Sequence, residues 1–258
     1  MSESVFRFKH FNLSNSRSAQ KIGTDGVLLG ACTSIADGRP LRILDIGTGT
    51  GIVALMLAQR CFGIEGRGCT GSMLSEIIGI DISADAAAEA SDNFAASPWA
   101  AAMEAKHLSL CDFADKLNFG GQDIPEDLHF DLIVCNPPYF DESLQAPDPK
   151  RNAARHTESL SYREAITFAG DALKDDGHLS IILPKTEEKG LMRFAASFGL
   201  FPTRIVNIHT TASKPPKRVI GEFSRHKGSI VNESLTIQCD GDYSPQYKEL
   251  TKDFHPQL

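Results

Sequence analysis

The chain has 258 residues, of which 41% are hydrophobic and 23% charged, so it can bury the core of one α/β domain and is not a disordered or fibrous chain. A formal net charge of -7 argues weakly against a polyanionic partner, although a local basic surface stays possible. The six cysteines are scattered without a CxxC pair, which favours reduced thiols over a disulfide framework, and we expect no metal site.

Residues 1–21 are polar and basic and lack the apolar segment of a signal peptide. No stretch of the chain approaches 18 uninterrupted apolar residues, so we expect no membrane contact and a cytoplasmic, soluble protein. Residues 21–31 combine a tight turn with an amphipathic start. We expect residues 1–40 to form an extension that packs at the ligand-binding end of the fold.

From residue 41 onward, short apolar runs alternate with longer helical patterns, which is typical of a parallel sheet covered by helices on both faces. Ser161 followed by Glu164 predicts a capping box at the start of one of these helices. The predicted strands are 41–46, 77–82, 107–110, 130–135 and 178–183. The predicted helices are 51–60, 84–96, 162–174 and 187–197.

The pattern changes after residue 201, where 204–209, 218–224 and 229–238 read as consecutive strands with turns between them. We therefore predict one domain over 1–258, with a core at 41–184 and C-terminal strands within 185–258. The expected fold is a Rossmann-like α/β fold: a doubly wound, mostly parallel seven-stranded sheet that ends in an antiparallel hairpin. Residues 61–76 and 113–129 read as two long loops.

A glycine-rich motif, Asp45-Ile-Gly-Thr-Gly-Thr-Gly51, joins the first predicted strand to the first helix. Gly47, Gly49 and Gly51 allow a sharp turn and a close approach of the backbone to a ligand. The dinucleotide fingerprint requires a third glycine where this chain has Ile52, so no pyrophosphate cradle is required. The motif suits S-adenosylmethionine, whose ammonium group Asp45 can neutralise directly or through water; a tight turn without a ligand is the alternative.

Two further acidic positions follow the second and third predicted strands. Asp81, with Ile82 beside it, ends the second strand, where a carboxylate can accept hydrogen bonds from both ribose hydroxyls or can cap a helix. In Cys111-Asp112-Phe113, Asp112 can accept from the exocyclic amine of an adenine and Phe113 can cover its ring. An ordinary loop is the alternative for this last segment.

The segment Asn136-Pro137-Pro138-Tyr139 follows the fourth predicted strand, at the edge where open α/β sheets bind ligands. The side-chain oxygen of Asn136 and the carbonyl of Pro137 can each accept one N–H of an amine whose lone pair is delocalised, and so orient its nitrogen toward a methyl donor. Pro137 and Pro138 stiffen the turn, and Tyr139 offers a flat face for a planar group. A proline strand terminator is the alternative.

The order DxGxGxG, IDIS, CDF and NPPY resembles the amino-methylating class I S-adenosylmethionine-dependent methyltransferases over residues 41–184. The stretches FRFKHFNLSNSRSAQKIGTDGVLLGA, NPPYFDESLQAPDPKRNAARHTESLSYREA and YKELTKDF are similar to the bacterial tRNA1(Val) adenine-37 N6-methyltransferases. The resemblance implies Thr24 and Asp25 beside the cofactor and a tRNA substrate, and we expect a monomer. The 61–76 segment departs from that family, because it is longer and richer in glycine.

Basic residues cluster after the NPPY segment and in the late strands, which offers candidate contacts to RNA phosphates; a solvated surface is the alternative. The candidates are Arg151, Arg155, His156, Lys214, Lys217 and Arg218. Competing functions are methylation of a protein glutamine amide, methylation of guanine N2 in rRNA, NAD-dependent oxidoreduction and nucleotide-binding regulation. Only 44 residues precede Asp45, which leaves little room for the substrate-binding region of the glutamine enzymes.

Overall fold

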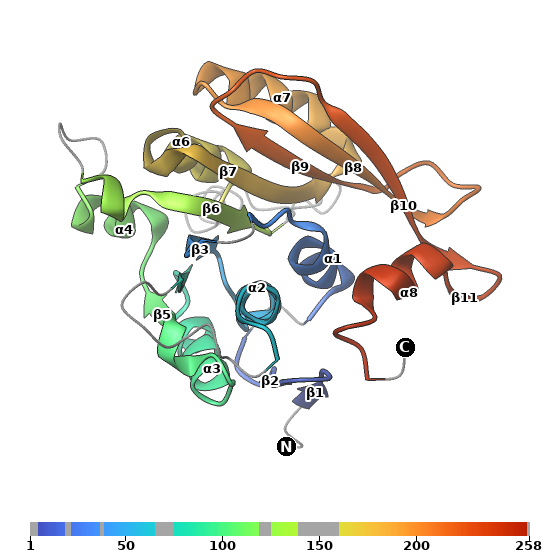
Figure 1. Ribbon diagram of the computed structural model, residues 1–258, viewed down its shortest axis with the longest axis horizontal. Coiled ribbons are helices and arrows are strands. Elements are labelled where there is room, and N and C mark those ends of the chain that lie inside the picture. Colours follow the sequence, from blue (N-terminus) through green and yellow to red (C-terminus); the bar gives the residue numbers. More distant parts are fainter. Residues whose placement is uncertain are drawn as a thin grey trace, which may run out of the picture.

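The computed structural model shows one large sheet with helices on both of its faces (Figure 1). It describes residues 5–18, 22–36, 39–64, 75–118, 125–138 and 160–256. The strands are β1 Val5–Arg7, β2 Asn12–Ser14, β3 Arg42–Ile46, β4 Glu76–Asp81, β5 Met103–His107, β6 Phe130–Cys135, β7 Leu173–Pro184, β8 Phe201–Thr211, β9 Arg218–Ser224, β10 Val231–Cys239 and β11 Asp242–Tyr243. The helices are α1 Thr24–Cys32, α2 Ile52–Phe62, α3 Ala84–Ala95, α4 Leu110–Lys116, α6 Tyr162–Ala172, α7 Glu188–Ser197 and α8 Pro245–Thr251, with 3-10 turns η2 Ala100–Ala102, η3 Glu126–Leu128 and η5 Lys185–Glu187.

The nine-stranded sheet has the order β11-β10-β8-β9-β7-β6-β3-β4-β5. Strand β3 lies between β4 and β6 and runs parallel to both, so the strand order reverses on either side of it. Such a reversal leaves a crevice at the carboxyl ends of the strands, where open α/β sheets bind their ligands. The topology therefore places a site beyond the ends of β3, β4 and β6.

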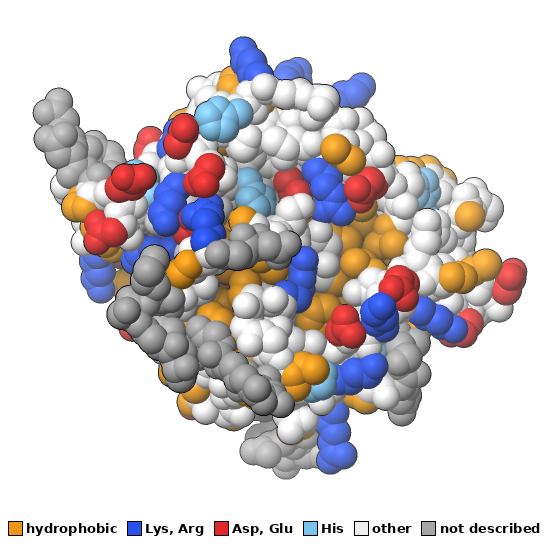
Figure 2. Space-filling view, in the orientation of Figure 1, with side chains coloured by type: hydrophobic (Ala, Val, Ile, Leu, Met, Phe, Trp, Pro, Cys, Tyr) orange, Lys and Arg blue, Asp and Glu red, His pale blue; other side chains and the backbone are white. Residues whose placement is uncertain are grey.

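Alternate residues of the central strands feed two separate cores, as strands buried on both faces require. Ile43 and Val134 belong to one core, which also contains residues of α1, α2 and α3. Leu44 and Cys135 belong to the other, which contains residues of α4, α6 and α7. Figure 2 shows hydrophobic side chains gathered at the centre of one face, over α1 and α2, with basic and acidic side chains mixed around them.

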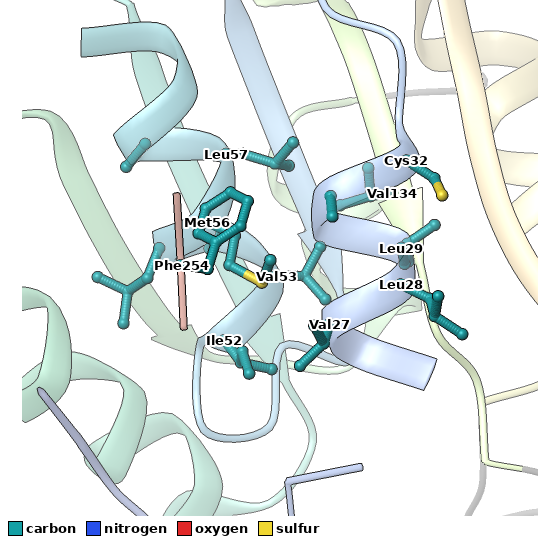
Figure 3. Packing of buried hydrophobic residues seen from close by; sticks show 14 of the residues in the cluster. Val27, Leu28, Leu29, Cys32, Ile52, Val53, Met56, Leu57, Val134 and Phe254 are labelled. Atoms are coloured by element: carbon teal, nitrogen blue, oxygen red, sulfur yellow. The ribbon is translucent and has the colours of Figure 1, made fainter. Parts of the chain in front are cut away.

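Helices α1 and α2 pack closely in front of β6, with Val27, Val53 and Val134 between them (Figure 3). A Cβ atom added to Gly30 would lie 2.9 Å from the side chain of Met56, so the approach of the two helices depends on this glycine. Phe254, near the end of the chain, packs on the same cluster. Residues 24–32 of the N-terminal region thus form helix α1, which packs on this core cluster.

The predicted helices begin and end within two residues of α2, α3, α6 and α7, and the capping box of Ser161 and Glu164 is present. Strands β3, β4 and β6 also begin and end within one residue of their predicted bounds. Strand β7 ends within one residue of its predicted end but begins at Leu173, earlier than expected. The strand predicted at 107–110 is wrong, because Ser109 caps α4 and accepts from the Asp112 N–H at 3.1 Å. Residues 113–116 are therefore helical rather than part of a loop.

The antiparallel hairpin near the end of the chain is confirmed as β8 and β9. Strand β10 was expected to continue the antiparallel pattern, but it lies on the far side of β8 and runs parallel to it. The sheet has nine strands in place of the seven of the expected fold, and β10 and β11 form its edge beyond β8. Among the described helices, none is both long enough and apolar enough to cross a membrane.

Candidate active site

A pocket of about 570 Å³ lies beyond the carboxyl ends of the central strands. Its wall includes Gly47 and Gly49 after β3, Asp81 at the end of β4, and Asn136 after β6. These residues come from three neighbouring strands and were all predicted to bind a cofactor or substrate. The structure therefore brings the main sequence motifs together at one site.

The glycine-rich turn adopts a backbone that other residues rarely reach. Gly47, Gly49 and Gly51 have φ angles of 71°, 57° and 84°. A Cβ atom on Gly51 would also lie 2.4 Å from the ring of Phe94, which packs beneath the turn from α3. The N–H groups of Gly47 and Thr48 donate to the carbonyl of Ile80 at 2.9 Å each, and this fixes the turn against β4.

Asp45 lies beneath this turn and is 1% exposed. Its carboxylate accepts a hydrogen bond from the Thr48 hydroxyl at 2.8 Å, so it organises the turn from behind and is not part of the pocket wall. Burial raises the pKa of Asp45 to about 7, against the opposing effect of the bond from Thr48. A cation bound above the turn would favour the ionised carboxylate.

Asp81 links the turn to the next helix and faces the pocket. One carboxylate oxygen accepts from the Gly49 N–H at 2.9 Å and the other from the Ser83 N–H at 2.8 Å. Neighbouring Ile82 is also in the pocket wall, and its 55% exposed side chain offers an apolar surface to a flat ring. Asp81 and Ile82, both predicted to bind a cofactor, therefore lie in the pocket wall.

Of the two residues predicted to contact an adenine, Asp112 and Phe113, only the first faces the pocket. Asp112 is in the pocket wall, and its carboxylate accepts from the Ser109 hydroxyl at 2.6 Å. Phe113 is not: it is 2% exposed and packs in the core, with ring centroids 6.3 Å from Phe130 and 6.1 Å from Phe168. Because 110–116 is a helix, consecutive side chains point about 100° apart and cannot both face the ligand.

Asn136 and Pro138 line the pocket, while Pro137 between them is buried. Helix α1 approaches this corner closely, since a Cβ atom on Gly26 would lie 3.1 Å from Ile52 and 4.0 Å from the Asn136 amide nitrogen. Of the remaining predicted site residues, Tyr139, Arg151, Arg155 and His156 lie outside the described part of the chain.

Thr24 and Asp25 lie at the start of α1, near Asn136, but do not belong to the pocket wall. Asp25 accepts a hydrogen bond from Arg218 Nε at 2.9 Å, which ties α1 to β9. A predicted cofactor residue and a predicted RNA-binding residue thus form an ion pair with each other. Arg218 is therefore less available to RNA than the two exposed lysines that precede it, Lys214 and Lys217.

Several residues of the pocket wall had no sequence signal for this role, and three of them come from segments away from the motifs. Ser18 comes from the N-terminal segment, Leu160 precedes α6, and Glu164 lies in the first turn of α6. Glu164 was recognised only as a helix cap, and its carboxylate accepts from the Ser161 N–H at 2.8 Å. Within the described residues, no group of three or more His, Cys, Asp or Glu side chains is placed to hold a metal ion.

A glycine-rich turn after the central strand, an acidic residue ending the next, and Asn-Pro-Pro after β6 together define a class I methyltransferase site. The family described as "Methyltransferase domain" matches residues 27–210. A tRNA1(Val) (adenine(37)-N6)-methyltransferase of Bacteroides fragilis is 37% identical over 259 residues, covering 100% of both chains. The chain belongs to the tRNA1(Val) (adenine(37)-N6)-methyltransferase family.

Other relatives agree with this assignment. The enzyme of the same name from Flavobacterium psychrophilum is 37% identical over 98% of this chain and 100% of its own. Among solved structures, a predicted O-methyltransferase from Agrobacterium tumefaciens superimposes with a TM-score of 0.63 at 18% identity, covering 89% of this chain and 96% of that one. This second likeness shows the fold alone.

Proposed function

We propose that the protein transfers a methyl group from S-adenosylmethionine to N6 of an adenine in tRNA, namely adenine 37 of tRNA1(Val), in the bacterial cytoplasm. The observation that carries the proposal is the position of Asn136 and Pro138 in the wall of a pocket that also contains the glycine turn and Asp81. Full-length similarity to enzymes of that name supports the choice of substrate over a protein glutamine or a guanine.

The pocket fits S-adenosylmethionine, which supplies an electrophilic methyl group on its sulfonium. Its volume of about 570 Å³ is in the range of small-molecule sites. In this proposal Asp81 accepts from the ribose hydroxyls, Asp112 accepts from the adenine amine, and Ile82 covers the adenine ring; all three residues line the pocket. Gly47 and Gly49 leave the backbone open to the amino-acid end, with Asp45 behind them.

Asn136 and Pro137 bind the target amine in this proposal. The Asn136 side-chain oxygen and the Pro137 carbonyl each accept one N–H, which holds the nitrogen in a pyramidal, nucleophilic geometry. No strong base is required before transfer, because the proton can leave afterwards. The adenine reaches the pocket out of its stack, which costs less in an anticodon loop than in a duplex.

The reaction is tested by incubating the protein with labelled S-adenosylmethionine and total bacterial tRNA, then digesting the RNA and identifying the labelled nucleoside. N6-methyladenosine from tRNA1(Val) is the expected product. Labelled N2-methylguanosine, or label in a protein in place of RNA, would assign one of the competing substrates.

Exchanging Lys214 and Lys217 for glutamine should weaken tRNA binding and flatten its dependence on salt. Both lysines are exposed in the β8–β9 turn. The turn lies at the same end of the strands as Asn136, because Arg218, which follows it, pairs with Pro184 at the end of β7, and β7 runs parallel to β6. Each lost phosphate contact should reduce the slope of log K against log salt by about 0.7 to 0.9. The slope is measured by titration between about 50 and 200 mM KCl. Lys227→Gln, beyond the opposite end of β9, is the matched control, and an unchanged slope in the double variant would remove the turn from the RNA surface.

Cofactor binding should depend on pH through Asp45. Because burial raises the pKa of Asp45 to about 7, part of the carboxyl population is protonated at neutral pH, and an ammonium group bound nearby favours the ionised form. Binding should therefore release protons, and affinity should fall as the pH is lowered from about 8 to about 6. Calorimetry in two buffers of different ionisation enthalpy measures the release, and Asp45→Asn should abolish the part due to this residue. Equal proton release in both proteins would contradict the role of Asp45.

A further inference from the structure

The N-terminal segment 14–18 begins at the end of β2, which lies beside α3 (Figure 1). Ser18, its last residue, is 4% exposed and forms part of the pocket wall. Its hydroxyl oxygen lies 4.0 Å from the position of a Cβ atom on Gly49, so the segment ends against the glycine turn. An irregular segment can keep this position only if its backbone groups are satisfied.

Glu89, on α3, satisfies three of these backbone groups at once. One carboxylate oxygen accepts from the N–H groups of Ser16 at 2.6 Å and Arg17 at 2.9 Å, and the other accepts from the Ser18 N–H at 2.8 Å. The Ser16 hydroxyl adds a further bond at 3.1 Å. Glu89 is 0% exposed, so these donors replace water around its charge.

The ionised state of Glu89 follows from the same contacts. Burial raises the pKa of Glu89, but the N–H bonds from Arg17, Ser18 and Ser16 outweigh it, and the pKa lies below its usual value. A carboxylate has only acceptors, which suits Glu89, because the groups that bond to it are N–H and hydroxyl donors. A glutamine amide would keep one acceptor oxygen and turn its NH2 group toward an N–H donor.

Asn93, one turn further along α3, extends this contact to the glycine turn. Its side-chain oxygen accepts from the Ser14 N–H at 2.8 Å, and its NH2 group donates to the carbonyls of Ser14 at 3.0 Å and Thr50 at 2.9 Å. One face of α3 therefore holds both the N-terminal segment and the turn that approaches the cofactor.

We infer that Glu89 is a positioning residue for the cofactor: it fixes the backbone of residues 14–18 so that Ser18 completes the pocket wall over the glycine turn. This inference rests on the proposed function in one respect, namely that the pocket binds S-adenosylmethionine. Glu89 does not touch the cofactor itself, since it is not in the pocket wall. Glu89 acts on cofactor binding only through the position of residues 14–18.

The first test compares wild-type protein with Glu89→Gln. We expect KM for S-adenosylmethionine to rise about tenfold or more, since charged hydrogen bonds are lost, while kcat at saturating cofactor stays within about threefold. Hydrogen exchange should become faster at the amides of residues 14–18 and remain slow in β3, β4 and β6. Asp85→Asn, which removes an exposed carboxylate from the same helix, should leave KM, kcat and exchange unchanged.

The second test needs no variant. Addition of S-adenosylhomocysteine to the wild-type protein should slow exchange at the amides of Ser16, Arg17 and Ser18, because the ligand holds the segment in place. Unchanged exchange there, despite measured binding, would overturn the inference while leaving the proposed function intact. Faster exchange in Glu89→Gln with an unchanged KM would also overturn it. Failure of the wild-type protein to bind the ligand would instead refute the proposed function, and the inference with it.

Discussion

Replacing Asn136 with alanine should lower turnover by about 100-fold or more and leave the Kd for S-adenosylmethionine within about threefold. In the proposed reaction the side-chain oxygen accepts an N–H of the target amine, and that bond strengthens as the nitrogen becomes pyramidal in the transition state. The cofactor keeps its other partners, Asp81 and the glycine turn, so its binding should change little. Single-turnover rates with tRNA and calorimetric titration with the cofactor measure the two quantities.

Asn136→Asp is the matched control for this experiment. It retains an acceptor oxygen of the same reach but adds a negative charge, so its turnover should lie between those of the wild type and the alanine variant. Turnover of Asn136→Ala within tenfold of wild type, with tRNA binding intact, would mean that Asn136 only lines the pocket and does not bind the reacting amine.

The parts of the fold that the sequence predicts well are those with a strong local signal. Residues 130–135 are apolar except for Asp131, a pattern that favours a strand buried on both faces, and β6 has these bounds. Strand β5 is an edge strand that carries Glu104 and Lys106, and it has no such run. Its weak pattern explains why the prediction fell on the residues that follow it.

Pairing between distant segments has no local signal. The parallel pairing of β10 with β8 requires the chain to cross β8 after β9, and nothing in residues 225–230 indicates that crossing. The same holds at the site. Ser18 and Glu89 are 71 positions apart and meet only because the N-terminal segment lies along α3. The motifs at strand ends are enough to predict where the pocket lies. The other residues of its wall are distant in sequence and are brought to the pocket only in the folded structure.

The ion pair of Asp25 with Arg218 also connects distant parts of the site. It joins the start of α1, which lies beside Asn136, to the first residue of β9, which follows the turn with Lys214 and Lys217. A partly exposed pair of this kind contributes little stability by itself. Its effect is geometric, because it links the proposed RNA-binding turn to the start of α1 beside Asn136.

Replacing Asp81 with alanine should raise the Kd for S-adenosylmethionine by about 30-fold or more. The carboxylate is the proposed acceptor for the ribose hydroxyls, and loss of one hydrogen bond to a charged group costs about 2 kcal/mol, equivalent to that factor. The change also removes the acceptor of the Gly49 and Ser83 N–H groups, which loosens the glycine turn. Both effects act on cofactor binding, so turnover at saturating cofactor should fall much less than in Asn136→Ala.

Two further variants separate ribose recognition from support of the turn. Asp81→Asn keeps one acceptor oxygen and the shape of the side chain, so its Kd should lie between those of wild type and Asp81→Ala. Asp85→Asn removes an exposed carboxylate in the first turn of α3, four residues after Asp81, and should bind like wild type. Replacing S-adenosylhomocysteine by its 2′-deoxy analogue should weaken binding to the wild type but add nothing in Asp81→Ala, because the acceptor is already gone. If the losses of affinity from Asp81→Ala and from removal of the 2′-hydroxyl were additive, Asp81 would only support the glycine turn, and another residue would bind the ribose.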